Sequence, residues 1–268
     1  MTRTYLASTG AEPDKPRAPL HPHAMPAQEK RPFVQQLFTR IAARYDAFNR
    51  LASMGLDQHW RKQAVAYGEV RPGMRVLDVC AGTGDLALIS AEAVGEDGAV
   101  FGLDFNAAML RYAKEKSAVR RRRAAWLQGD ALQLPFSTGS FDRVTIGFST
   151  RNLTDLTAGL KEMLRVIRPG GWLIILETGR PANAVVRFGY YLFLTTVVRV
   201  IGFLLTGQTW PFTYLARSVK QFVTPRVFVE RLDGLGSQAR YIPLSGGLVS
   251  LFIATKEGNA QLAASNGR

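Results

Sequence analysis

A glycine turn flanked by carboxylates is the clearest candidate binding site in this sequence. The turn, Gly82–Gly84, follows the β-prone run Arg75–Cys80 and precedes a helix-prone segment. This order of strand, turn and helix is typical of sites that bind a nucleoside at the helix N-terminus. Glycine lets the backbone approach a ligand closely, because it has no Cβ. Asp78 and Asp85 flank the turn, so a ligand bound here would meet negative charge.

The same turn is compatible with a dinucleotide, since Ala87 can replace the third glycine of that fingerprint and Asp104 follows at the spacing of a ribose contact. Asp85 separates the two interpretations, because its carboxylate would repel a pyrophosphate at this helix N-terminus. S-adenosylmethionine contains no phosphate, and its sulfonium and α-ammonium groups are both positive. We therefore predict that the cofactor is S-adenosylmethionine.

The elements around the turn predict a parallel sheet covered by helices on both faces, because short apolar runs alternate with helix-prone segments. The strand-like runs are 75–80, 99–104, 124–128, 143–147 and 172–177, and helix-like segments include 85–89, 107–116 and 158–167. Two last runs, 238–244 and 247–254, predict an antiparallel hairpin around Ser245 and Gly246. The predicted fold class is α/β: a Rossmann-like class I methyltransferase with a mostly parallel seven-stranded sheet, a C-terminal hairpin and a helical cap.

Two further aspartates follow predicted strands. In a doubly wound sheet the ligand crevice lies at the carboxyl ends of the strands. Asp104 ends the second predicted strand, where it can accept hydrogen bonds from both ribose hydroxyls. Asp130 follows the third, where it can accept one from the adenine amino group. Each aspartate alone is equally compatible with a helix cap, so the prediction depends on their occurring together.

The chain of 268 residues is long enough for one sizeable domain with tails. Residues 1–30 contain five prolines and no sustained apolar periodicity, which predicts a disordered tail. We expect one methyltransferase domain over 31–256, with an N-terminal helical lid at 31–70 and a substrate cap at 182–225. Residues 257–268 are expected to form a C-terminal tail.

The formal net charge of +13 suits a polyanionic partner, either nucleic acid or an anionic bilayer, although a solvated basic surface explains it equally well. The apolar segment Ala184–Leu205 is interrupted by Arg187 and Arg199, which leaves an uncharged run of eleven residues. Such a run is too short to cross a bilayer, so we predict an amphipathic cap that offers a surface for an isoprenoid tail, with both arginines meeting lipid phosphates.

From about Phe33 to Lys256 the chain resembles the UbiE/MenG family of quinone-biosynthesis C-methyltransferases. The most specific motifs are R-Y-D-x-x-N at Arg44–Asn49 and T-R-N at Thr150–Asn152, whereas the glycine turn is common to many methyltransferases. The resemblance implies methyl transfer to a ring carbon of a prenylated quinol, either demethylmenaquinol or its counterpart in the ubiquinone pathway.

The resemblance also implies cofactor contacts at Thr83, Asp104, Asp130 and Ala131. Gly147 stands where relatives often have serine, so one polar contact would be missing or replaced by backbone or water. Together with the residues of the turn, the predicted cofactor-binding set is Asp78, Gly82, Thr83, Gly84, Asp104, Phe105, Asp130, Ala131 and Gly147.

Catalysis by such an enzyme requires an aligned acceptor whose ring carbon is made nucleophilic by an ionised phenolic hydroxyl. We predict that Arg151 stabilises the developing phenolate and that Asn152 orients the hydroxyl or a water that removes its proton. The alternative for Arg151 is a surface arginine paired with Asp155. Tyr45 and Tyr214 are expected either to close over the donor methyl or to be core aromatics.

The remaining expectations concern other functions and partners. The alternative function is a phospholipid N-methyltransferase, which would use the same cofactor fold. Nucleic acid is not expected as a partner, because no RNA-binding module is recognisable. His59 is expected to be structural, and the lone Cys80 provides no basis for a metal site. The expected location is the cytoplasm and, if the cap binds lipid, the inner face of the cell membrane; a homodimer is left open.

Overall fold

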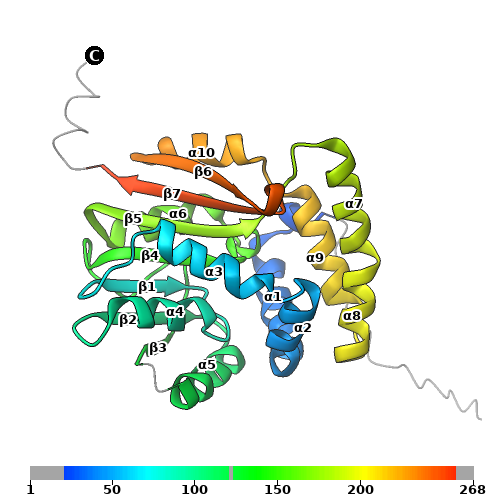
Figure 1. Ribbon diagram of the computed structural model, residues 1–268, viewed down its shortest axis with the longest axis horizontal. Coiled ribbons are helices and arrows are strands. Elements are labelled where there is room, and N and C mark those ends of the chain that lie inside the picture. Colours follow the sequence, from blue (N-terminus) through cyan, green and yellow to red (C-terminus); the bar gives the residue numbers. More distant parts are fainter. Residues whose placement is uncertain (1–20, 121–122, 258–268) are drawn as a thin grey trace, which may run out of the picture.

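The computed structural model describes residues 21–120 and 123–257, and these form one seven-stranded sheet in the order β3-β2-β1-β4-β5-β7-β6 (Figure 1). The first five strands along the chain pair in parallel, and β7 is antiparallel to both of its neighbours, so the predicted fold class is confirmed. The strands are β1 (Arg75–Val79), β2 (Ala99–Asp104), β3 (Ala125–Gln128), β4 (Phe141–Gly147), β5 (Ile167–Thr178), β6 (Ser237–Leu244) and β7 (Val249–Lys256).

Helices cover both faces of this sheet because alternate residues of the buried strands face opposite sides. Val76 packs with apolar residues of α4 on one face, whereas its neighbour Leu77 packs with residues of α6 and α10 on the other. The helices are α1 (Ala27–Ile41), α2 (Tyr45–Ala52), α3 (Leu56–Tyr67), α4 (Asp85–Val94), α5 (Ala107–Arg120), α6 (Leu156–Val166), α7 (Ala184–Thr195), α8 (Val197–Thr206), α9 (Trp210–Gln221) and α10 (Pro225–Asp233).

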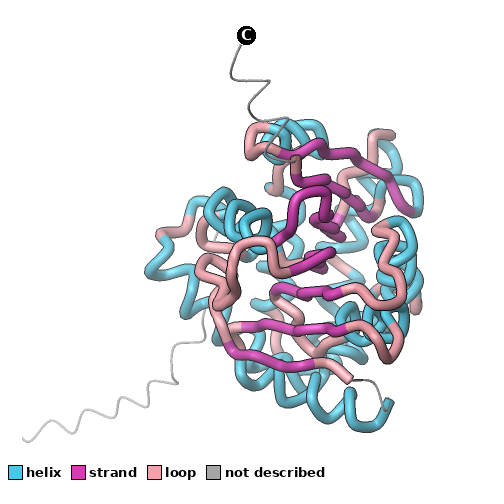
Figure 2. The backbone as a smooth tube through the Cα atoms, turned by 90° about the vertical axis from the view of Figure 1, so that its left-hand side faces the viewer, coloured by secondary structure: helices cyan, strands magenta, loops and turns pink. Residues whose placement is uncertain are grey.

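A separate helical layer stands at one end of the sheet. Helices α1, α2, α7, α8 and α9 gather beside the ends of the strands (Figure 1), and Figure 2 shows the strands stacked edge to edge from the side. Their facing side chains, such as Leu37, Phe48, Leu194 and Phe212, form an apolar cluster distinct from the clusters on the sheet. Helices α1 and α2 of the predicted lid thus form one packed layer with the cap, whereas α3, the rest of the predicted lid, packs against α4 and β5 of the sheet domain.

The N-terminal segment is ordered further upstream than the proline content predicts. Residues 21–30, which we expected to be disordered, contain a short 3₁₀ helix at Pro22–Ala24 and the first turn of α1. Lys30 is buried and donates to the carbonyl oxygens of Arg151 and Leu153 at 3.2 and 2.7 Å, and His23 lies 2.8 Å from the carbonyl oxygen of Ser218. These long-range contacts offset the entropy of ordering. Residues 1–20 of the predicted tail, and 258–268 of the C-terminal one, lie outside the described residues.

Strand β5 begins earlier than predicted. Ile167 pairs with Phe141 and Trp172 pairs with Arg143, so the residues between Ile167 and Trp172 protrude from the ladder as a bulge. The predicted C-terminal hairpin is present, and its turn is a short 3₁₀ segment at Ser245–Gly247.

Helices α7 and α8 form one apolar stretch of 23 residues, Ala184–Thr206, with mean hydropathy 1.7. By length and composition alone this stretch could cross a bilayer, which the short uncharged run led us not to expect. Leu194 and Val198 are buried in the helical cluster and the helix is interrupted at Thr196, but most of the stretch is exposed, with 17% of its most apolar window buried.

Candidate active site

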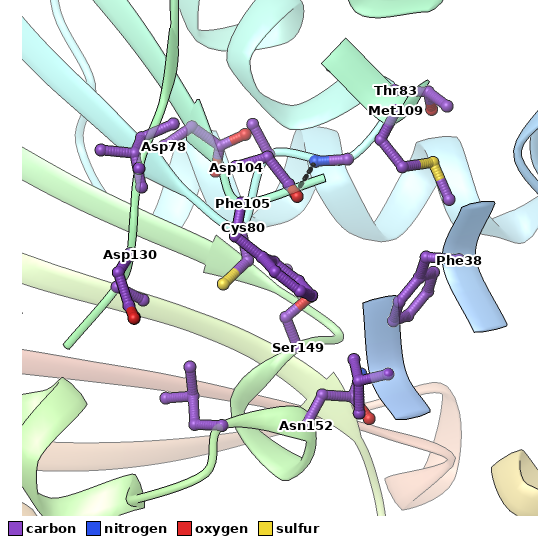
Figure 3. A pocket seen from close by; sticks show the side chains of 18 of the residues that line it. Phe38, Asp78, Cys80, Thr83, Asp104, Phe105, Met109, Asp130, Ser149 and Asn152 are labelled. Carbon is purple, nitrogen blue, oxygen red and sulfur yellow. Dashed lines mark hydrogen bonds between the residues drawn. The ribbon is translucent and has the colours of Figure 1, made fainter. Parts of the chain in front are cut away.

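The first pocket lies where the predicted cofactor site was placed, at the carboxyl ends of β1, β2 and β4 (Figure 3). We call it the donor pocket. Eight of the nine predicted cofactor-binding residues line it, namely Asp78, Gly82, Thr83, Asp104, Phe105, Asp130, Ala131 and Gly147. The structure brings them together because the parallel strands end at one edge of the sheet.

Gly84 does not line the pocket. Its φ of +85° is a left-handed conformation, and a Cβ placed on it would lie 2.4 Å from the Trp126 ring and 3.1 Å from the Ala113 Cβ. Glycine is therefore required here to let α4 approach α5 and β3, rather than to admit a ligand.

Gly84→Ala is expected to destabilise the fold by about 2–5 kcal/mol, because a left-handed alanine costs roughly 1–2 kcal/mol and overpacking adds roughly 1–3 kcal/mol. Gly73→Ala is the matched control, since Gly73 has φ +81° with no atom within 4 Å of a Cβ. Chemical denaturation measures both. Equal losses in the two variants would show that the close approach at Gly84 contributes nothing.

Asp104 fixes the glycine turn while remaining at the surface of the pocket. Its Oδ2 accepts from the Gly82 N–H and its Oδ1 from the Asn106 N–H, each at 2.8 Å. Burial raises the pKa of this carboxyl to about 6. Each oxygen retains a lone pair, so the carboxylate can still accept from ribose hydroxyls as predicted.

Asp78 carries a buried carboxylate oxygen without a hydrogen-bond partner, a feature expected of a site that binds a cation. It is 1% exposed, and its Oδ1 accepts from the Thr145 hydroxyl at 2.7 Å, whereas its Oδ2 is buried without a hydrogen-bond partner. Burial raises the pKa of this carboxyl from 3.8 to about 7. An unpaired buried carboxylate is costly unless a ligand supplies the missing charge. The donor pocket therefore fits the cationic end of S-adenosylmethionine.

These shifts predict a pH-dependent affinity. Folding raises both pKa values, so the stability contributed by protonated Asp78 and Asp104 is present below about pH 4 and is lost as pH rises through about 6 and 7. A cationic ligand prefers the ionised carboxylates. S-adenosylmethionine affinity should accordingly rise by up to about tenfold per pH unit between about pH 6 and 7, where Asp78 alone titrates, more steeply below about pH 6, and level off above about pH 7. Calorimetry in two buffers should detect proton release; a flat affinity over this range would contradict the assignment.

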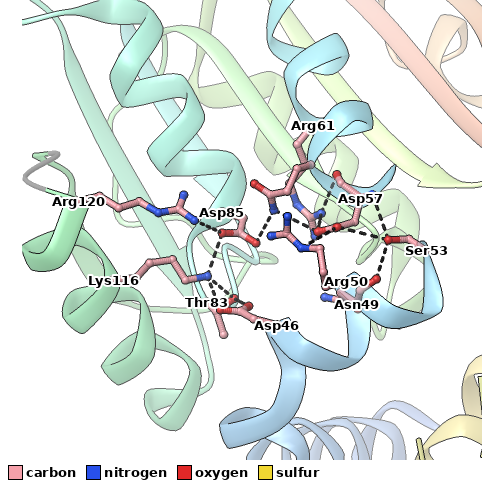
Figure 4. A network of polar contacts seen from close by, with 11 residues as sticks. Asp46, Asn49, Arg50, Ser53, Asp57, Arg61, Thr83, Asp85, Lys116 and Arg120 are labelled. Carbon is pink, nitrogen blue, oxygen red and sulfur yellow. Dashed lines mark hydrogen bonds and ion pairs between the residues drawn. The ribbon is translucent and has the colours of Figure 1, made fainter. Parts of the chain in front are cut away.

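Asp85 does not act as the sequence suggested. Its carboxylate is bound by Lys116 at 2.9 Å, by Arg120 at 3.6 Å and by the Gln58 amide at 2.8 Å (Figure 4). Lys116 lowers the pKa of this carboxyl despite the opposing effect of burial. Its charge is therefore largely compensated within the protein.

Thr83 is held by the lid. Its hydroxyl donates to Asp46 of α2 at 2.5 Å and accepts from Lys116 at 3.3 Å (Figure 4). The same network joins α2 to α4 and α5 across the glycine turn. The side chain of Thr83 is thus engaged within the protein, which leaves its backbone for the predicted cofactor contact.

Asp130 is paired with the first lid helix. Its Oδ2 lies 3.0 Å from Arg31 of α1, and its Oδ1 accepts from the Leu132 N–H at 2.9 Å. Arg31 is 59% exposed, so the pair is weak and a ligand amino group can compete for the carboxylate. This contact could not be predicted, because Arg31 and Asp130 are far apart in the chain.

A second, larger cavity of about 430 Å³ lies between the lid and the cap, and we call it the acceptor cavity. Its wall is mostly apolar and aromatic, with contributions from α1, α2, α7 and α9. The two pockets share the lining residues Phe38, Tyr45, Arg61 and Asn152. A group carried from the donor pocket to the acceptor cavity must pass between these four residues.

Arg151 lines the acceptor cavity, and its predicted surface pairing with Asp155 is wrong. Its Nη1 binds the Glu177 Oε1 at 2.5 Å and the Phe148 carbonyl oxygen at 2.6 Å, while Asp155 instead caps α6. Arg151 is 7% exposed and Glu177 0%. The Nε of Arg151 is buried without a partner. The Arg151 guanidinium is therefore held by Glu177 at the wall of the cavity, where it can contribute a charge-assisted hydrogen bond to an oxyanion.

Asn152 is oriented by its neighbours toward the junction of the pockets. Its Oδ1 accepts from the Tyr214 hydroxyl at 3.1 Å, and its Nδ2 is buried without a partner. Lys30 holds the carbonyl oxygens on either side of Asn152, and burial lowers the pKa of this amine to about 8. The free amide N–H₂ can thus donate to a hydroxyl or phenolate oxygen at this point.

The other predicted residues fall into two groups. Tyr45 lines both pockets and Tyr214 lines the acceptor cavity, so each is placed to exclude water. His59 is exposed and lines neither pocket. Cys80 lines the donor pocket, and burial raises the pKa of its thiol.

Sequence reasoning missed several residues of the site: Lys30, Arg31, Phe38, Arg61 and Glu177. Arg61 is buried, binds Asp57 at 2.8 Å and stacks over the Phe148 ring at 5.3 Å from its centroid. No local sequence signal marked Arg61, whose neighbours on α3 are mostly polar, as a residue of the site.

The chain matches the ubiE/COQ5 methyltransferase family over residues 24–256. It is 39% identical to the demethylmenaquinone methyltransferase of Desulfitobacterium hafniense over 232 residues, covering 85% of this chain and 92% of that protein. It is 38% identical to the demethylmenaquinone methyltransferase of Deinococcus radiodurans, covering 85% and 95%. Among solved structures, a SAM-dependent methyltransferase from Aquifex aeolicus shares the fold with a TM-score of 0.57 at 18% identity, covering 78% and 96%.

Proposed function

The chain belongs to the ubiE/COQ5 methyltransferase family, and we propose that it uses S-adenosylmethionine to methylate a ring carbon of demethylmenaquinol. The observation that carries this proposal is the junction of the two pockets. A donor pocket lined by the buried Asp78 carboxylate shares four lining residues with an apolar cavity that is also lined by Arg151. An apolar acceptor with one ionisable hydroxyl fits that cavity.

Different residues bind the methyl donor and activate the acceptor. S-adenosylmethionine supplies an electrophilic methyl group when it is bound. Asp78 and Asp104 hold it in the donor pocket, and Phe38 and Tyr45 keep water from the junction. Alignment of this kind contributes on the order of 7 kcal/mol in favourable cases.

Arg151 and Asn152 activate the acceptor. The guanidinium stabilises a phenolate oxygen, and the Asn152 amide orients the same oxygen or its neighbouring water. A phenolate, formed when the hydroxyl proton passes to water, pushes electron density onto the ortho carbon. That carbon would take the methyl group as its bond to sulfur breaks, S-adenosylhomocysteine would leave, and the ring carbon would then lose its own proton to water. The acceptor must be the reduced quinol, because an oxidised quinone is an electrophile.

The phospholipid N-methyltransferase alternative has less support. A protonated headgroup amine would need a carboxylate at the acceptor end. Asp57, which lines the cavity, is already bound to Arg61 and Arg50 at 2.8 and 3.4 Å. The positive charge of Arg151 favours a phenolate instead.

Mass spectrometry of the cellular quinone pool tests the proposal. Removal of the protein should replace menaquinone by demethylmenaquinone, and restoration should reverse the change. An unchanged quinone pool, with loss of methylated phospholipid headgroups, would support the alternative function.

We also propose that the enzyme works at the inner face of an anionic membrane through the outer surface of α7 and α8. This surface, the membrane face, consists of exposed apolar side chains: Val185, Val186, Phe188, Leu192, Val197, Val200, Phe203 and Leu204. These are eight of the fourteen large apolar side chains that are exposed among the described residues, so they form a concentrated patch rather than scattered positions.

The two arginines of this segment differ. Arg187 donates to the carbonyl oxygens of Pro181 and Ala182 at 2.9 and 3.0 Å, so part of its hydrogen-bonding capacity is used within the protein. Arg199 is exposed and can meet a lipid phosphate. Contact with a lipid phosphate is therefore better supported for Arg199 than for Arg187.

The double change Phe188→Glu and Leu204→Glu should weaken binding to anionic vesicles at least about tenfold, because insertion of two apolar side chains is lost. Vesicle flotation measures the bound fraction. Val119→Glu is the control, since Val119 is 84% exposed on α5. Equal flotation of the double variant, the control and the native protein would contradict the membrane face.

A further inference from the structure

The acceptor cavity has one exposed rim. Among its lining residues only Met54, Leu56, Val186 and Gly189 are exposed, and the others are buried or partly buried. Met54 and Leu56 come from the connection of α2 to α3 and the start of α3, whereas Val186 and Gly189 belong to α7. These four residues, which we call the mouth, mark where the cavity reaches the surface.

Polar groups also line the cavity. Arg151 is buried and Asn152 is partly buried, and Asn152 also borders the donor pocket. The cavity thus combines side chains that can bind an oxygen atom with mostly apolar walls that reach the surface at the mouth. A molecule with a phenolic head and a hydrocarbon tail matches this polarity in one orientation.

The size of the cavity limits how much of such a molecule it can hold. A volume of about 430 Å³ lies in the lower part of the range for pockets that enclose small ligands. A ring with the first part of a prenyl chain fits this volume, and a longer chain must continue through the mouth. Val186 belongs to both the mouth and the membrane face, so a tail leaving there passes directly onto apolar side chains.

Gly189 gives the mouth its width on the α7 side. No atom lies within 4 Å of a Cβ built on Gly189, and its backbone is not left-handed. Any larger side chain at this position is free of backbone strain and would project into open space at the rim. Glycine inside a helix otherwise costs about 1 kcal/mol relative to alanine, so its presence here calls for a reason.

We propose that Gly189 is a specificity-determining residue that keeps the mouth open for the prenyl tail of the acceptor. The inference rests on the proposed quinol methylation and adds the path of the tail. The ring is bound at Arg151 and Asn152, and the tail runs outward between α7 and the connection of α2 to α3. Enzymes with an open mouth accept tails of any length, whereas a blocked mouth accepts only those that fit within the cavity.

Gly189→Trp tests the path with two quinols that carry the same ring, one with a single isoprene unit and one with a long prenyl tail, both presented in detergent micelles. We expect kcat/KM for the long-tail quinol to fall at least about tenfold and that for the short-tail quinol to change less than about threefold. Val119→Trp, on the exposed surface of α5, should alter neither value.

Val186→Trp provides a second block of the mouth should Gly189→Trp fold poorly, and circular dichroism monitors folding of both. Equal loss for the two quinols, or no loss for either, in folded variants would overturn the proposal. Failure of the proposed function has a different signature, since the native protein would then methylate neither quinol.

Discussion

Arg151→Met is expected to lower kcat by about 100- to 1,000-fold, which is the usual effect of removing one preorganised donor from a developing oxyanion. The guanidinium is buried beside the acceptor cavity next to Asn152, and the other arginine of the cavity wall, Arg61, is engaged by Asp57 at 2.8 Å. S-adenosylmethionine affinity should stay within about threefold of the native value, because Arg151 does not line the donor pocket. Single-turnover kinetics and calorimetry measure the two quantities separately.

Arg151→Met should also lower the stability of the protein, and this effect tests the buried ion pair between Arg151 and Glu177. Glu177 is fully buried, and removal of its cation leaves a charge without compensation, at a cost of about 3–5 kcal/mol. The double variant Arg151→Met with Glu177→Gln should recover most of that stability but none of the activity. Full activity in the double variant would refute a catalytic role for Arg151, whereas unchanged stability in Arg151→Met would refute the buried ion pair.

Asp78→Asn should change stability and affinity in opposite directions. At about pH 8 the native carboxylate is ionised, buried and lacks a partner at Oδ2, so its neutral isostere should stabilise the ligand-free protein. Cofactor binding should weaken by about 30-fold or more, since loss of one partner from a buried charge pair costs roughly 2–5 kcal/mol. The pH dependence of affinity attributed to Asp78 should disappear as well.

Thermal unfolding and calorimetry across the pH range decide this prediction. Asp142→Asn is a carboxylate control, because Asp142 lies at the start of β4, outside both pockets, and is paired with Arg168 at 2.7 Å. If Asp78→Asn lost stability but kept its affinity for S-adenosylmethionine, the carboxylate would have only a structural role in β1.

The sequence predicted the donor pocket well because the pocket depends on local rules. A parallel strand ends near the glycine turn, and the next strands end beside it, so Asp78, Asp104 and Asp130 had to converge. The hairpin followed from two apolar runs around Ser245 and Gly246. Periodicity and turn chemistry are sufficient for features of this kind.

The charge partners could not be predicted in the same way. Lys116 neutralises Asp85, Arg31 binds Asp130, and Glu177 binds Arg151, and in each case the partners come from different elements. Their pairing depends on how the lid and the strands pack in three dimensions. The electrostatic argument from Asp85 led to the cofactor that the family implies, but it did not foresee that Lys116 compensates this carboxylate.

The order of residues 21–30 was also missed, because the prediction used composition alone. Prolines and the lack of periodicity in residues 21–30 predicted disorder, yet Lys30 is buried and binds the turn that carries Arg151 and Asn152. Composition reports the average preference of a segment, and a few long-range contacts override it. The end of the lid is thereby tied to the catalytic turn.

Transfer of an isotopically labelled methyl group is the most direct test of the central claim, that this chain joins a cationic methyl donor to a quinol carbon. Purified protein would be incubated with methyl-deuterated S-adenosylmethionine, demethylmenaquinol and phosphatidylethanolamine in the same vesicles. We predict one labelled methyl group on the quinol ring carbon, identified by mass spectrometry and fragmentation. Label on the phospholipid nitrogen or on a quinol oxygen, with none on the ring carbon, would contradict the account.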